Sequence, residues 1–543
     1  MALALARYLI TKCNFRRTSI RIDKPSALLL AQAASVEITR DRSHFPAGAS
    51  PALVPATSAG PSAAASPAPP AAPAGAAAVP AAPRGADAGV GRHCVYLALG
   101  SNLGDRAAHI ARALDLLVTD AGCTVADTAF LYETPPAYVV DQPSFLNTAC
   151  RVYTDLGPRD LLAALKRIEA ALGRQPTVRY GPRTVDLDIL FYDDLELRDP
   201  DLTIPHALLH EREFVLRPLC DIASAHEHPV LQKTVGHLLL HLKERSAIWR
   251  VLPVAPNTVW RWGERTRLMG ILNVTDDSFS DGGKYLAADA AVAHAQQMVA
   301  DGADIIDVGG MSSRPHAAEV PPDVEAGRVV EVIRRLRAAG VTVPISVDTY
   351  RASVAAAALE AGANMVNDIS GGARDPAMRP FLARAGVPVC LMHMRGDAST
   401  MTTAEAKTYD GPGGVVAAVR TELAEAVGAA LAAGVRRWNV LVDPGLGFAK
   451  NPAQSLELVR GLRELVAPDH ELAGFPTLAG PSRKGFVGAV VHRDVDGRAW
   501  GTAAACAALV SQGVDVLRVH DVREMAEVIR MGDAIWRASP DSG

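Results

Sequence analysis

Two aspartates separated by a single residue, Asp186 and Asp188, are the side chains whose spacing most directly suggests chemistry. On an extended segment, residues i and i+2 point to the same side of the strand. Neighbouring carboxylates repel unless a cation lies between them, and Mg²⁺ prefers oxygen ligands. Arg179 and Arg183, just upstream, suit a polyphosphate. The pattern predicts metal-assisted phosphoryl transfer from a nucleotide, and the alternative is a solvated edge strand with ordinary ion pairs.

The elements that would position this pair are predicted within a folded domain over 93–242. They are a strand over 94–99, a helix beginning after Asp105, strands over 128–134 and 145–152, a helix over 159–172 and the carboxylate-bearing strand over 183–191. The order β-α-β-β-α-β is typical of a ferredoxin-like α+β sandwich. We therefore expect the two aspartates on a strand of an antiparallel sheet.

Seven segments of this domain, taken in order, resemble hydroxymethyldihydropterin pyrophosphokinase. They are 98–105 (ALGSNLGD), 132–135 (YETP), 142–147 (QPSFLN), 168–174 (IEAALGR), 179–188 (RYGPRTVDLD), 204–206 (IPH) and 212–219 (REFVLRPL). The resemblance implies transfer of the β,γ-diphosphate of ATP to 6-hydroxymethyl-7,8-dihydropterin, with release of AMP. It also implies catalysis by positioning and charge neutralisation, with little covalent chemistry from the protein.

The same resemblance implies a role for each matching residue. Asp186 and Asp188 would hold two Mg²⁺ ions, and Arg174 and Arg183 would act with them in catalysis. The ATP-binding residues would be Arg174, Arg179, Arg183, His206 and Arg212, and the pterin-binding residues Thr134, Pro135, Phe145, Asn147 and Phe214. Tyr180 stands where the family usually has Trp, so an aromatic lid remains and we expect altered affinity instead of lost function.

A second domain is predicted over 257–540, where short apolar runs alternate with Ala-rich amphipathic helices. The runs are 268–273, 305–309, 345–348, 365–368, 387–393, 440–443, 477–480 and 514–520. Eight strands each followed by a helix predict a TIM (β/α)8 barrel, and a doubly wound sheet is the alternative. Polar residues gather where the strands end, which is the catalytic face of such a barrel. They are Asn273, Asp307, Asp348, Asn367, Asp368, His393, Asp443, the segment 482–484, Arg518 and His520.

Eight segments of this domain resemble dihydropteroate synthase. They are 269–283, 307–315, 345–349, 366–369, 391–394, 443–448, 480–484 and 518–520. The resemblance implies condensation of dihydropterin pyrophosphate with p-aminobenzoate to give 7,8-dihydropteroate and pyrophosphate. Pyrophosphate would leave first, forming a pterin-stabilised cation that the aromatic amine then attacks.

The implied roles again fall on matching positions. The pterin would be bound by Asp348, Asn367, Asp443 and Lys484, and p-aminobenzoate by Ser313, Arg314, Pro315, Ser482 and Lys484. Met392 and Phe448 would be further substrate-binding residues. Pyrophosphate would be bound by Asn273, Arg518 and His520, with one Mg²⁺ on Asn273. Asp443, Lys484 and Arg518 would be catalytic. Loops carrying Phe279, Asp281 and Arg314 would close over the site. The family usually has Pro where Asp276 stands and often an acidic residue where Met311 stands, which affects loop order and sulfonamide response.

The two resemblances together predict a bifunctional folate-biosynthesis enzyme, because the product of the first domain is the substrate of the second. One alternative is a pterin-dependent methyltransferase barrel fused to a pterin kinase. Ser482, Lys484, Arg518 and His520 argue against it, because a methyl carrier needs no pyrophosphate or aminobenzoate pocket. A non-enzymatic scaffold would have lost its metal pair or its phosphate cluster, and both are intact.

Composition limits the partners. The chain has 543 residues and a net charge of −4, so no basic excess suggests nucleic acid. Its 7 cysteines include no C-x-x-C pair, which fits buried free thiols in a reducing compartment. No charge-free apolar run long enough to span a bilayer occurs outside the Ala/Pro tract, so we expect no membrane partner. We expect small-molecule substrates and a homodimer or higher homo-oligomer formed through the barrel.

The N-terminal residues differ from the rest. Residues 1–40 are rich in Arg, Lys and Ser and resemble a transit peptide, which predicts the mitochondrial matrix, with a plastid or the cytoplasm as alternatives. Residues 41–92 are mostly Ala, Pro, Gly and Ser, so they predict a disordered linker. Residues 243–256 are predicted to connect the two domains.

Overall fold

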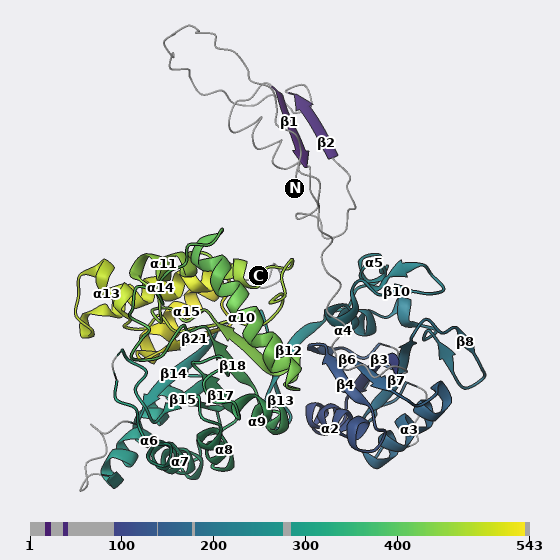
Figure 1. Cartoon of the computed structure of the whole chain (residues 1–543), viewed down its shortest axis with the longest axis horizontal. Helices are drawn as coiled ribbons and strands as arrows, with labels where there is room; N and C mark the ends of the chain where they lie inside the picture. The colour runs from purple at the N-terminus through teal and green to yellow at the C-terminus, as the bar shows by residue number, and fades with distance from the viewer. Residues whose placement is uncertain are drawn as a thin grey trace. The chain divides into compact units, whose positions relative to one another are not determined.

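The structure is a computed structural model of the chain (Figure 1). It describes residues 92–137, 139–175, 180–274, 284–315 and 317–537, with the backbone alone for 284–287 and for two strands near the N-terminus. These strands, β1 (Arg17–Ile22) and β2 (Val36–Asp41), pair antiparallel. The other residues of the predicted transit peptide and linker before Arg92 lie outside the described residues, as do Arg179, Asp276, Phe279 and Asp281.

The first folded domain follows the predicted β-α-β-β-α-β order with one additional strand. Its elements are β3 (His93–Ser101), α2 (Arg106–Thr119), β4 (Thr124–Thr128), β5 (Leu131–Thr134), β6 (Phe145–Thr154), α3 (Pro158–Ala171) and β7 (Asp186–Tyr192). The single strand predicted over 128–134 is two strands. The interruption falls at Phe130, because its backbone N–H donates to the carboxylate of Asp221 instead of to a neighbouring strand.

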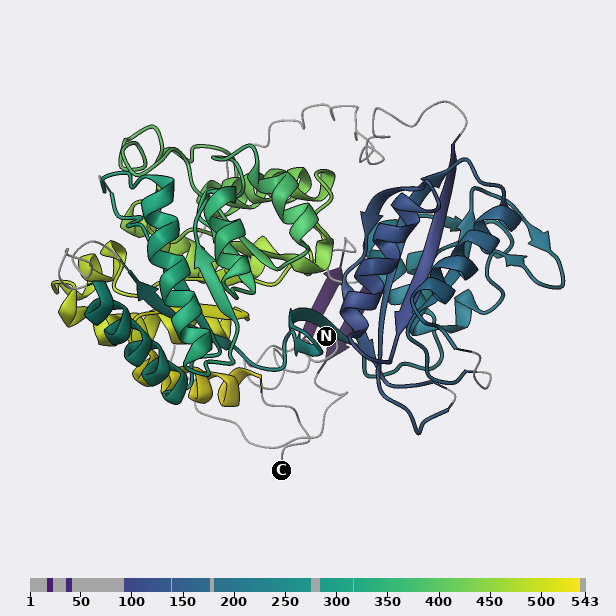
Figure 2. The ribbon, with the colours of Figure 1, turned by 90° about the horizontal axis from the view of Figure 1, so that it is seen from below.

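Helices cover both faces of this domain's sheet, whose strand order is β13-β12-β5-β6-β3-β7 with β4 also paired to β6 (Figure 2). Alternation along β3 divides the core in two. Val95 and Leu97 share one apolar cluster with α2 and α3. Tyr96 and Ala98 share another with α4 (Glu213–Ala223) and α5 (Val235–Leu240). The short strands β8 (Leu197–Arg198), β9 (Thr203–Ile204), β10 (Glu227–His228) and β11 (Lys233–Thr234) complete the domain.

The segment predicted as a connector contains a strand. β12 (Trp249–Ala255) forms a hairpin with β13 (Thr258–Arg261), and β12 also pairs antiparallel with β5. Val251 and Val259 belong to the apolar core of the first domain. Leu252, Val254 and Trp260 instead pack with the apolar residues that begin the barrel strands. One hairpin therefore contributes side chains to two cores.

Eight parallel strands form the predicted barrel. They are β14 (Arg267–Asn273), β15 (Ile305–Gly309), β16 (Ile345–Asp348), β17 (Met365–Asp368), β18 (Val389–Met392), β19 (Val440–Asp443), β20 (Leu478–Ala479) and β21 (Val516–Val519). Their order is β19-β18-β17-β16-β15-β14-β21-β20. A parallel bridge between Val442 and Thr477 joins β19 to the start of β20. The sheet thus closes, which confirms a TIM barrel over a doubly wound sheet.

Helices surround these strands (Figure 1). They are α6 (Lys284–Ala300), α7 (Pro322–Ala338), α8 (Ala352–Glu360), α9 (Met378–Ala385), α10 (Gly414–Ala432), α11 (Pro452–Arg460), α12 (Leu462–Leu465), α13 (Gly485–Val491), α14 (Ala499–Ser511) and α15 (Val522–Trp536). Every residue of β15, β17, β18 and β19 is buried, as parallel strands covered on both sides require. Across the described ranges, no helix has the combined length and apolarity needed to cross a bilayer.

Candidate active sites

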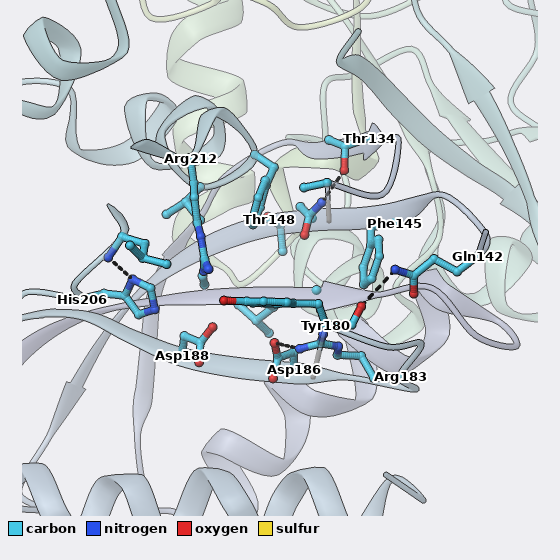
Figure 3. Close-up of a pocket in the computed structure, with 18 of the residues that line it drawn as sticks. Thr134, Gln142, Phe145, Thr148, Tyr180, Arg183, Asp186, Asp188, His206 and Arg212 are labelled. Atoms are coloured by element: carbon cyan, nitrogen blue, oxygen red, sulfur yellow. Dashed lines mark hydrogen bonds and ion pairs between the residues drawn. The ribbon is translucent and has the colours of Figure 1, made fainter. Parts of the chain in front are cut away.

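A cavity of about 600 Å³ lies on the first domain, lined by β3, β5, β6, β7 and the start of α4 (Figure 3). Its size suits a ligand of a few hundred daltons. Its lining brings together these predicted residues: Thr134, Pro135, Phe145, Asn147, Arg174, Arg183, Asp186, Asp188, His206, Arg212 and Phe214. Side chains predicted for nucleotide, metal and pterin therefore share one cavity.

Asp186 and Asp188 both line this cavity, while Leu187 between them is buried in the core on the other side of the strand. Arg174 donates to one oxygen of Asp186 at 2.6 Å, and Arg183 pairs with the other. Burial and the negative charge of Asp186 raise the pKa of Asp188 to about 6. The two carboxylates therefore repel each other, and a cation bound between them would relieve this repulsion.

The opposite part of the cavity is a slot between aromatic and amide groups. The Asn147 side-chain amide donates to Oγ1 of Thr134 at 2.8 Å. Gly100 gives this amide its room, because a Cβ there would lie 2.9 Å from Oδ1 of Asn147. The guanidinium of Arg183 lies 5.9 Å from the ring centre of Phe145. Such a slot suits a flat heterocycle with hydrogen-bonding edges.

Tyr180 reaches across the cavity between Arg212 and the two aspartates (Figure 3). Its backbone φ is +64°, in the left-handed region. Gln142 holds that backbone, because its Nε2 donates to the carbonyl of Tyr180 at 3.0 Å. Asn102 in turn donates to Oε1 of Gln142 at 3.1 Å. The aromatic side chain at this departure from the family pattern thus lies over the predicted ligand site.

His206 lies in the same cavity as a neutral imidazole. Burial, followed by the nearby charge of Arg212, lowers the pKa of His206 to about 4. Its Nδ1 accepts from the backbone N–H of Leu208 at 3.3 Å, which leaves Nε2 as the N–H donor. His206 can therefore donate a hydrogen bond to a ligand at neutral pH but adds no positive charge.

In the barrel, strand register places predicted residues beside one another at the carboxyl ends. Asn273 lies opposite Gly309, which lies opposite Asp348. Asp348 lies opposite Asn367 on the next strand. On the far side of β18, Met392 lies opposite Asp443. Four of the predicted polar residues, Asn273, Asp348, Asn367 and Asp443, therefore lie at the carboxyl ends of the barrel strands.

Arg518 sits between two of the predicted carboxylates. Its Nε donates to Asp307 at 2.6 Å and its Nη2 to Asp348 at 2.7 Å. Asn367 also donates to Asp307, at 3.1 Å. Burial disfavours the charge of Arg518, but the neighbouring carboxylates outweigh it and raise the pKa of Arg518. Burial raises the pKa of Asp348 to about 7, although Arg518 opposes the shift.

Lys484 and Asp443 face the loop that follows β19. The Lys484 ammonium donates to the carbonyl of Leu446 at 2.6 Å and lies 4.4 Å from the ring centre of Phe448. Burial lowers the pKa of Lys484 to about 8, with the charge of Asp443 opposing the shift. Asp443 accepts from the backbone N–H of Gly445 at 2.7 Å, and burial raises its pKa. A cation, a carboxylate and an aromatic face thus share one corner.

His520 and Ser482 meet at the ends of the last two strands. The backbone N–H of His520 donates to Oγ of Ser482 at 3.1 Å, and Nδ1 of His520 lies 3.0 Å from the same oxygen. Burial and then Arg518 lower the pKa of His520 to about 4, so its ring is neutral. Ser313 is half-buried and Arg314 and Pro315 are exposed on the loop after β15.

Comparison with known proteins covers both domains. Residues 96–224 match the 7,8-dihydro-6-hydroxymethylpterin-pyrophosphokinase (HPPK) family, and residues 269–520 match the pterin binding enzyme family. The folic acid synthesis protein fol1 of Schizosaccharomyces pombe is 40% identical over 532 residues, covering 98% of this chain and 67% of that protein. The mitochondrial folate synthesis bifunctional protein of Pisum sativum is 40% identical, covering 82% of this chain and 89% of that protein. The chain belongs to the bifunctional folate-synthesis family.

A solved structure has the same two-domain fold as this folate-synthesis chain. The wild-type Plasmodium falciparum HPPK-DHPS with pteroate aligns with a TM-score of 0.67 at 22% identity, covering 82% of this chain and 97% of that one. The two family matches and the bifunctional relatives, and not this fold likeness, show that the chain is a bifunctional enzyme with a pyrophosphokinase domain and a dihydropteroate synthase barrel. The methyltransferase alternative is not favoured, because the bifunctional relatives match along both domains.

The pyrophosphokinase domain contains a supporting residue for which the sequence analysis predicted no role. Glu169 is buried, and its Oε1 accepts from the backbone N–H of Leu187 at 2.8 Å. The same side chain pairs with Arg174 and with Lys166. Glu169 thus fixes both the carboxylate strand and a predicted ATP ligand. The sequence signal that could have revealed this role is a carboxylate on the apolar face of an amphipathic helix, because such a side chain is rarely buried unless it is paired.

The synthase barrel contains a second such residue. Lys450 is buried, and its ammonium donates to Nδ1 of His393 and to the carbonyl of Phe448, both at 2.9 Å. His393 was predicted only as one of the polar residues at the strand ends. Nothing in the spacing of Lys450 indicates burial, since a lysine after a loop is usually solvated.

Proposed function

We propose that the pyrophosphokinase domain transfers the terminal diphosphate of ATP to the hydroxymethyl group of 6-hydroxymethyl-7,8-dihydropterin and releases AMP. The barrel then joins the resulting dihydropterin pyrophosphate to p-aminobenzoate, forming 7,8-dihydropteroate and pyrophosphate. The observation that carries the first reaction is the shared cavity, in which an aspartate pair and two arginines lie across from an aromatic and amide slot.

Magnesium fits the aspartate pair. Asp188 is held beside Asp186 with its pKa raised to about 6, and a divalent cation would relieve this repulsion. The described residues contain no cluster of three or more His, Cys, Asp or Glu side chains suited to a metal. Phosphate oxygens of ATP would therefore have to complete the coordination, as expected for Mg²⁺. When bound, two such ions would neutralise phosphate charge and orient the hydroxyl for attack.

The protein groups of this domain bind and orient. Arg174, Arg183 and Arg212 lie at the same cavity and would neutralise the charge of the triphosphate. His206 would donate a hydrogen bond from its neutral ring to the nucleotide. Thr134 and Asn147 would bind the polar edge of the pterin, with Pro135 beside it and the rings of Phe145 and Phe214 against its faces. Holding hydroxyl and phosphate in line is the main contribution to rate.

In the barrel, Asp348, Asn367, Asp443 and Lys484 would bind the pterin, with Met392 and Phe448 as apolar contacts. The Asp443 carboxylate would stabilise positive charge on the ring as pyrophosphate leaves. Arg518 and His520 would bind the leaving pyrophosphate. This requires Arg518 to share its guanidinium between phosphate and the carboxylates of Asp307 and Asp348. Ser313, Arg314, Pro315, Ser482 and Lys484 would contact p-aminobenzoate.

One magnesium ion fits beside Asn273. A Cβ added to Gly309 would lie 3.6 Å from Oδ1 of Asn273 and 3.7 Å from Oδ2 of Asp348. The absence of a side chain at Gly309 thus leaves space beside the amide oxygen of Asn273. A cation held there would supply charge neutralisation for the departing pyrophosphate.

The proposal is tested by supplying the purified chain with ATP, Mg²⁺, 6-hydroxymethyl-7,8-dihydropterin and p-aminobenzoate and measuring AMP and dihydropteroate. Replacing Asp186 and Asp188 together by Ala should abolish AMP release while preserving the synthase reaction on preformed dihydropterin pyrophosphate. Lys484→Ala should do the reverse. Equal loss of both activities in either variant would contradict this division of labour.

Localisation and assembly are further parts of the proposal. The basic N-terminus and the mitochondrial name of the Pisum sativum relative support the mitochondrial matrix. A fusion of residues 1–92 to a fluorescent protein tests this, with plastid or cytoplasmic fluorescence as the contrary result. Exposed apolar side chains on α14 and α15, among them Trp500, Met531 and Ile535, support a homodimer through the barrel. Light scattering on the purified chain would give the mass.

A further inference from the structure

The hairpin β12–β13 lies outside both family matches. The pyrophosphokinase match ends at residue 224, and the pterin-binding match begins at residue 269. Nevertheless β12 pairs with β5, the strand that ends at Thr134 of the proposed pterin slot. The pairing runs from Trp249 opposite Glu133 to Val251 opposite Leu131. The strand that supports the slot is therefore bordered by residues assigned to neither domain family.

Two arginines of the hairpin contact β5 from its two faces. The Arg250 guanidinium lies 5.8 Å from the ring centre of Tyr132. The Nε of Arg261 donates to Oε2 of Glu133 at 2.7 Å. Tyr132 and Glu133 are successive residues of a strand, so their side chains point to opposite faces of the sheet. The hairpin thus contacts side chains of β5 on both faces of the sheet.

Glu133 relays this contact to the slot. Its Oε1 accepts from Nη1 of Arg106 at 2.9 Å, and the same nitrogen donates to the carbonyl of Ser144 at 2.8 Å. Ser144 directly precedes Phe145, which lines the cavity and lies opposite Thr134 in the β5–β6 register. The chain of contacts therefore ends at Thr134 and Phe145, which lie opposite each other on neighbouring strands and both line the cavity.

We infer that the hairpin is a working part of the pyrophosphokinase site and that Arg261 is a positioning residue for its pterin slot. Arg261 acts through Glu133 and does not touch the substrate. The Glu133 side chain is only 9% exposed, and its ion pairs with Arg106 and Arg261 offset the cost of burying a carboxylate. Without Arg261, the Glu133 carboxylate is held by Arg106 alone, the same guanidinium that binds the carbonyl of Ser144. The inference rests on the proposed pterin substrate of this cavity.

The geometry separates this role from support of the barrel. Residues of the hairpin that pack on the barrel strands are Leu252, Val254 and Trp260. Arg261 is directed to Glu133 on the first domain and is 40% exposed. Replacing it therefore leaves the apolar contacts of the barrel in place. The ATP-binding side of the cavity, with Arg174 and Asp186, is likewise outside this chain of contacts.

The test uses the full chain with Arg261→Gln. Its KM for 6-hydroxymethyl-7,8-dihydropterin should rise about threefold to tenfold, as expected for one half-exposed charge-assisted bond, while its KM for ATP stays unchanged. Arg261→Lys should stay within about twofold of the parent, because an ammonium can still reach Glu133. Arg265→Gln is the matched control, since Arg265 pairs with Asp304 on the barrel and should leave both KM values unchanged. Synthase activity on preformed dihydropterin pyrophosphate should be unaffected in all three.

A second variant separates the relay from simple destabilisation. In a Glu133→Gln background, Arg261→Gln should add no further rise in the pterin KM, because the acceptor of its bond has lost its charge. An unchanged pterin KM in Arg261→Gln, or equal rises in the two KM values, would overturn the inference. Failure of the parent chain to release AMP would instead refute the proposed function, so the two failures are distinguishable.

Discussion

The ammonium of Lys450 donates a hydrogen bond to Nδ1 of His393 across 2.9 Å inside the synthase barrel. This fixes the ring, whose Nε2 then lies 2.9 Å from a carboxylate oxygen of Glu422. Lys450 also donates to the carbonyl of Phe448. A polar chain from α10 through β18 therefore anchors the loop that carries the proposed pterin contact Phe448.

Replacing Lys450 by Met should lower kcat of the synthase reaction about tenfold or more, because misplacing groups around the reacting centre is costly. The pyrophosphokinase reaction of the same protein is the internal control and should be unchanged. A second readout is pH-dependent stability. Burial lowers the pKa of Lys450 from 10.5 to about 7. Between these values the unfolded chain keeps a proton that the folded chain has released, so stability should rise with pH across this window.

That rise should be smaller in Lys450→Met, measured by urea unfolding of the barrel at several pH values between 7 and 10. Comparing the variant with its parent at each pH removes the contribution of other titrating groups. If the free energy of unfolding changed with pH in the same way in both proteins, the pKa of Lys450 would not be lowered by folding and the prediction would be wrong.

Deprotonation of Lys484 should reduce the rate of the synthase reaction at alkaline pH. Burial lowers the pKa of Lys484 to about 8. Only the protonated amine carries the charge that the proposed substrate contact needs, so kcat/KM should fall as pH rises through about 8. The kcat/KM profile reports the pKa values of the free enzyme. In Lys484→Arg, the kcat/KM of the remaining activity should not fall above pH 8, because a guanidinium stays charged.

Gly445 permits a close backbone approach beneath the same loop. Its φ is +65°, and a Cβ there would lie 2.0 Å from the carbonyl oxygen of His393. Gly445→Ala should therefore destabilise the barrel by roughly 2 kcal/mol or more and reduce synthase activity. Gly428→Ala is the matched control, because Gly428 lies within α10 with no neighbour near the added Cβ and should be neutral or slightly stabilising. Thermal unfolding of both variants tests the difference.

Tyr180 should tune affinity in the pyrophosphokinase domain. Its side chain lies over the cavity, and its backbone is held through Gln142 (Figure 3). Tyr180→Trp should lower the KM of a substrate about twofold to fivefold, because the larger ring offers more contact area. Tyr180→Ala should raise the same KM. If both variants changed KM in the same direction, a role as an aromatic lid would be wrong.

Local patterns in the sequence were enough to predict most of the fold. The eight barrel strands fall where apolar runs end in polar residues, because burial on both faces leaves a continuous apolar signal. Asp186 and Asp188 face one side because alternation is a property of any strand. The hairpin was missed for the opposite reason. Its residues alternate between two different cores, so Val251 and Leu252 are both apolar and no single periodicity marks the segment.

The partners of charged residues were much harder to predict. The pairing of Arg518 with Asp307 joins residues 211 positions apart. That of Arg261 with Glu133 spans 128 positions. Such pairs depend on strand register and on which face each side chain occupies, and neither is encoded locally. Lys450 is the clearest case, since its burial follows from the position of His393 and not from its own neighbours.

The two-sided hairpin has a consequence for how this polypeptide can be divided. Cutting the gene just before residue 249 would leave the second fragment with Val251 and Val259 bare and the first with β5 as an open edge. Unpaired strand edges and exposed apolar strands tend to associate with other chains. The two fragments should therefore aggregate when each is expressed alone and stay soluble only when they are expressed together. Two separate proteins evolved from this fusion would need polar side chains at the positions where the hairpin and β5 now pack.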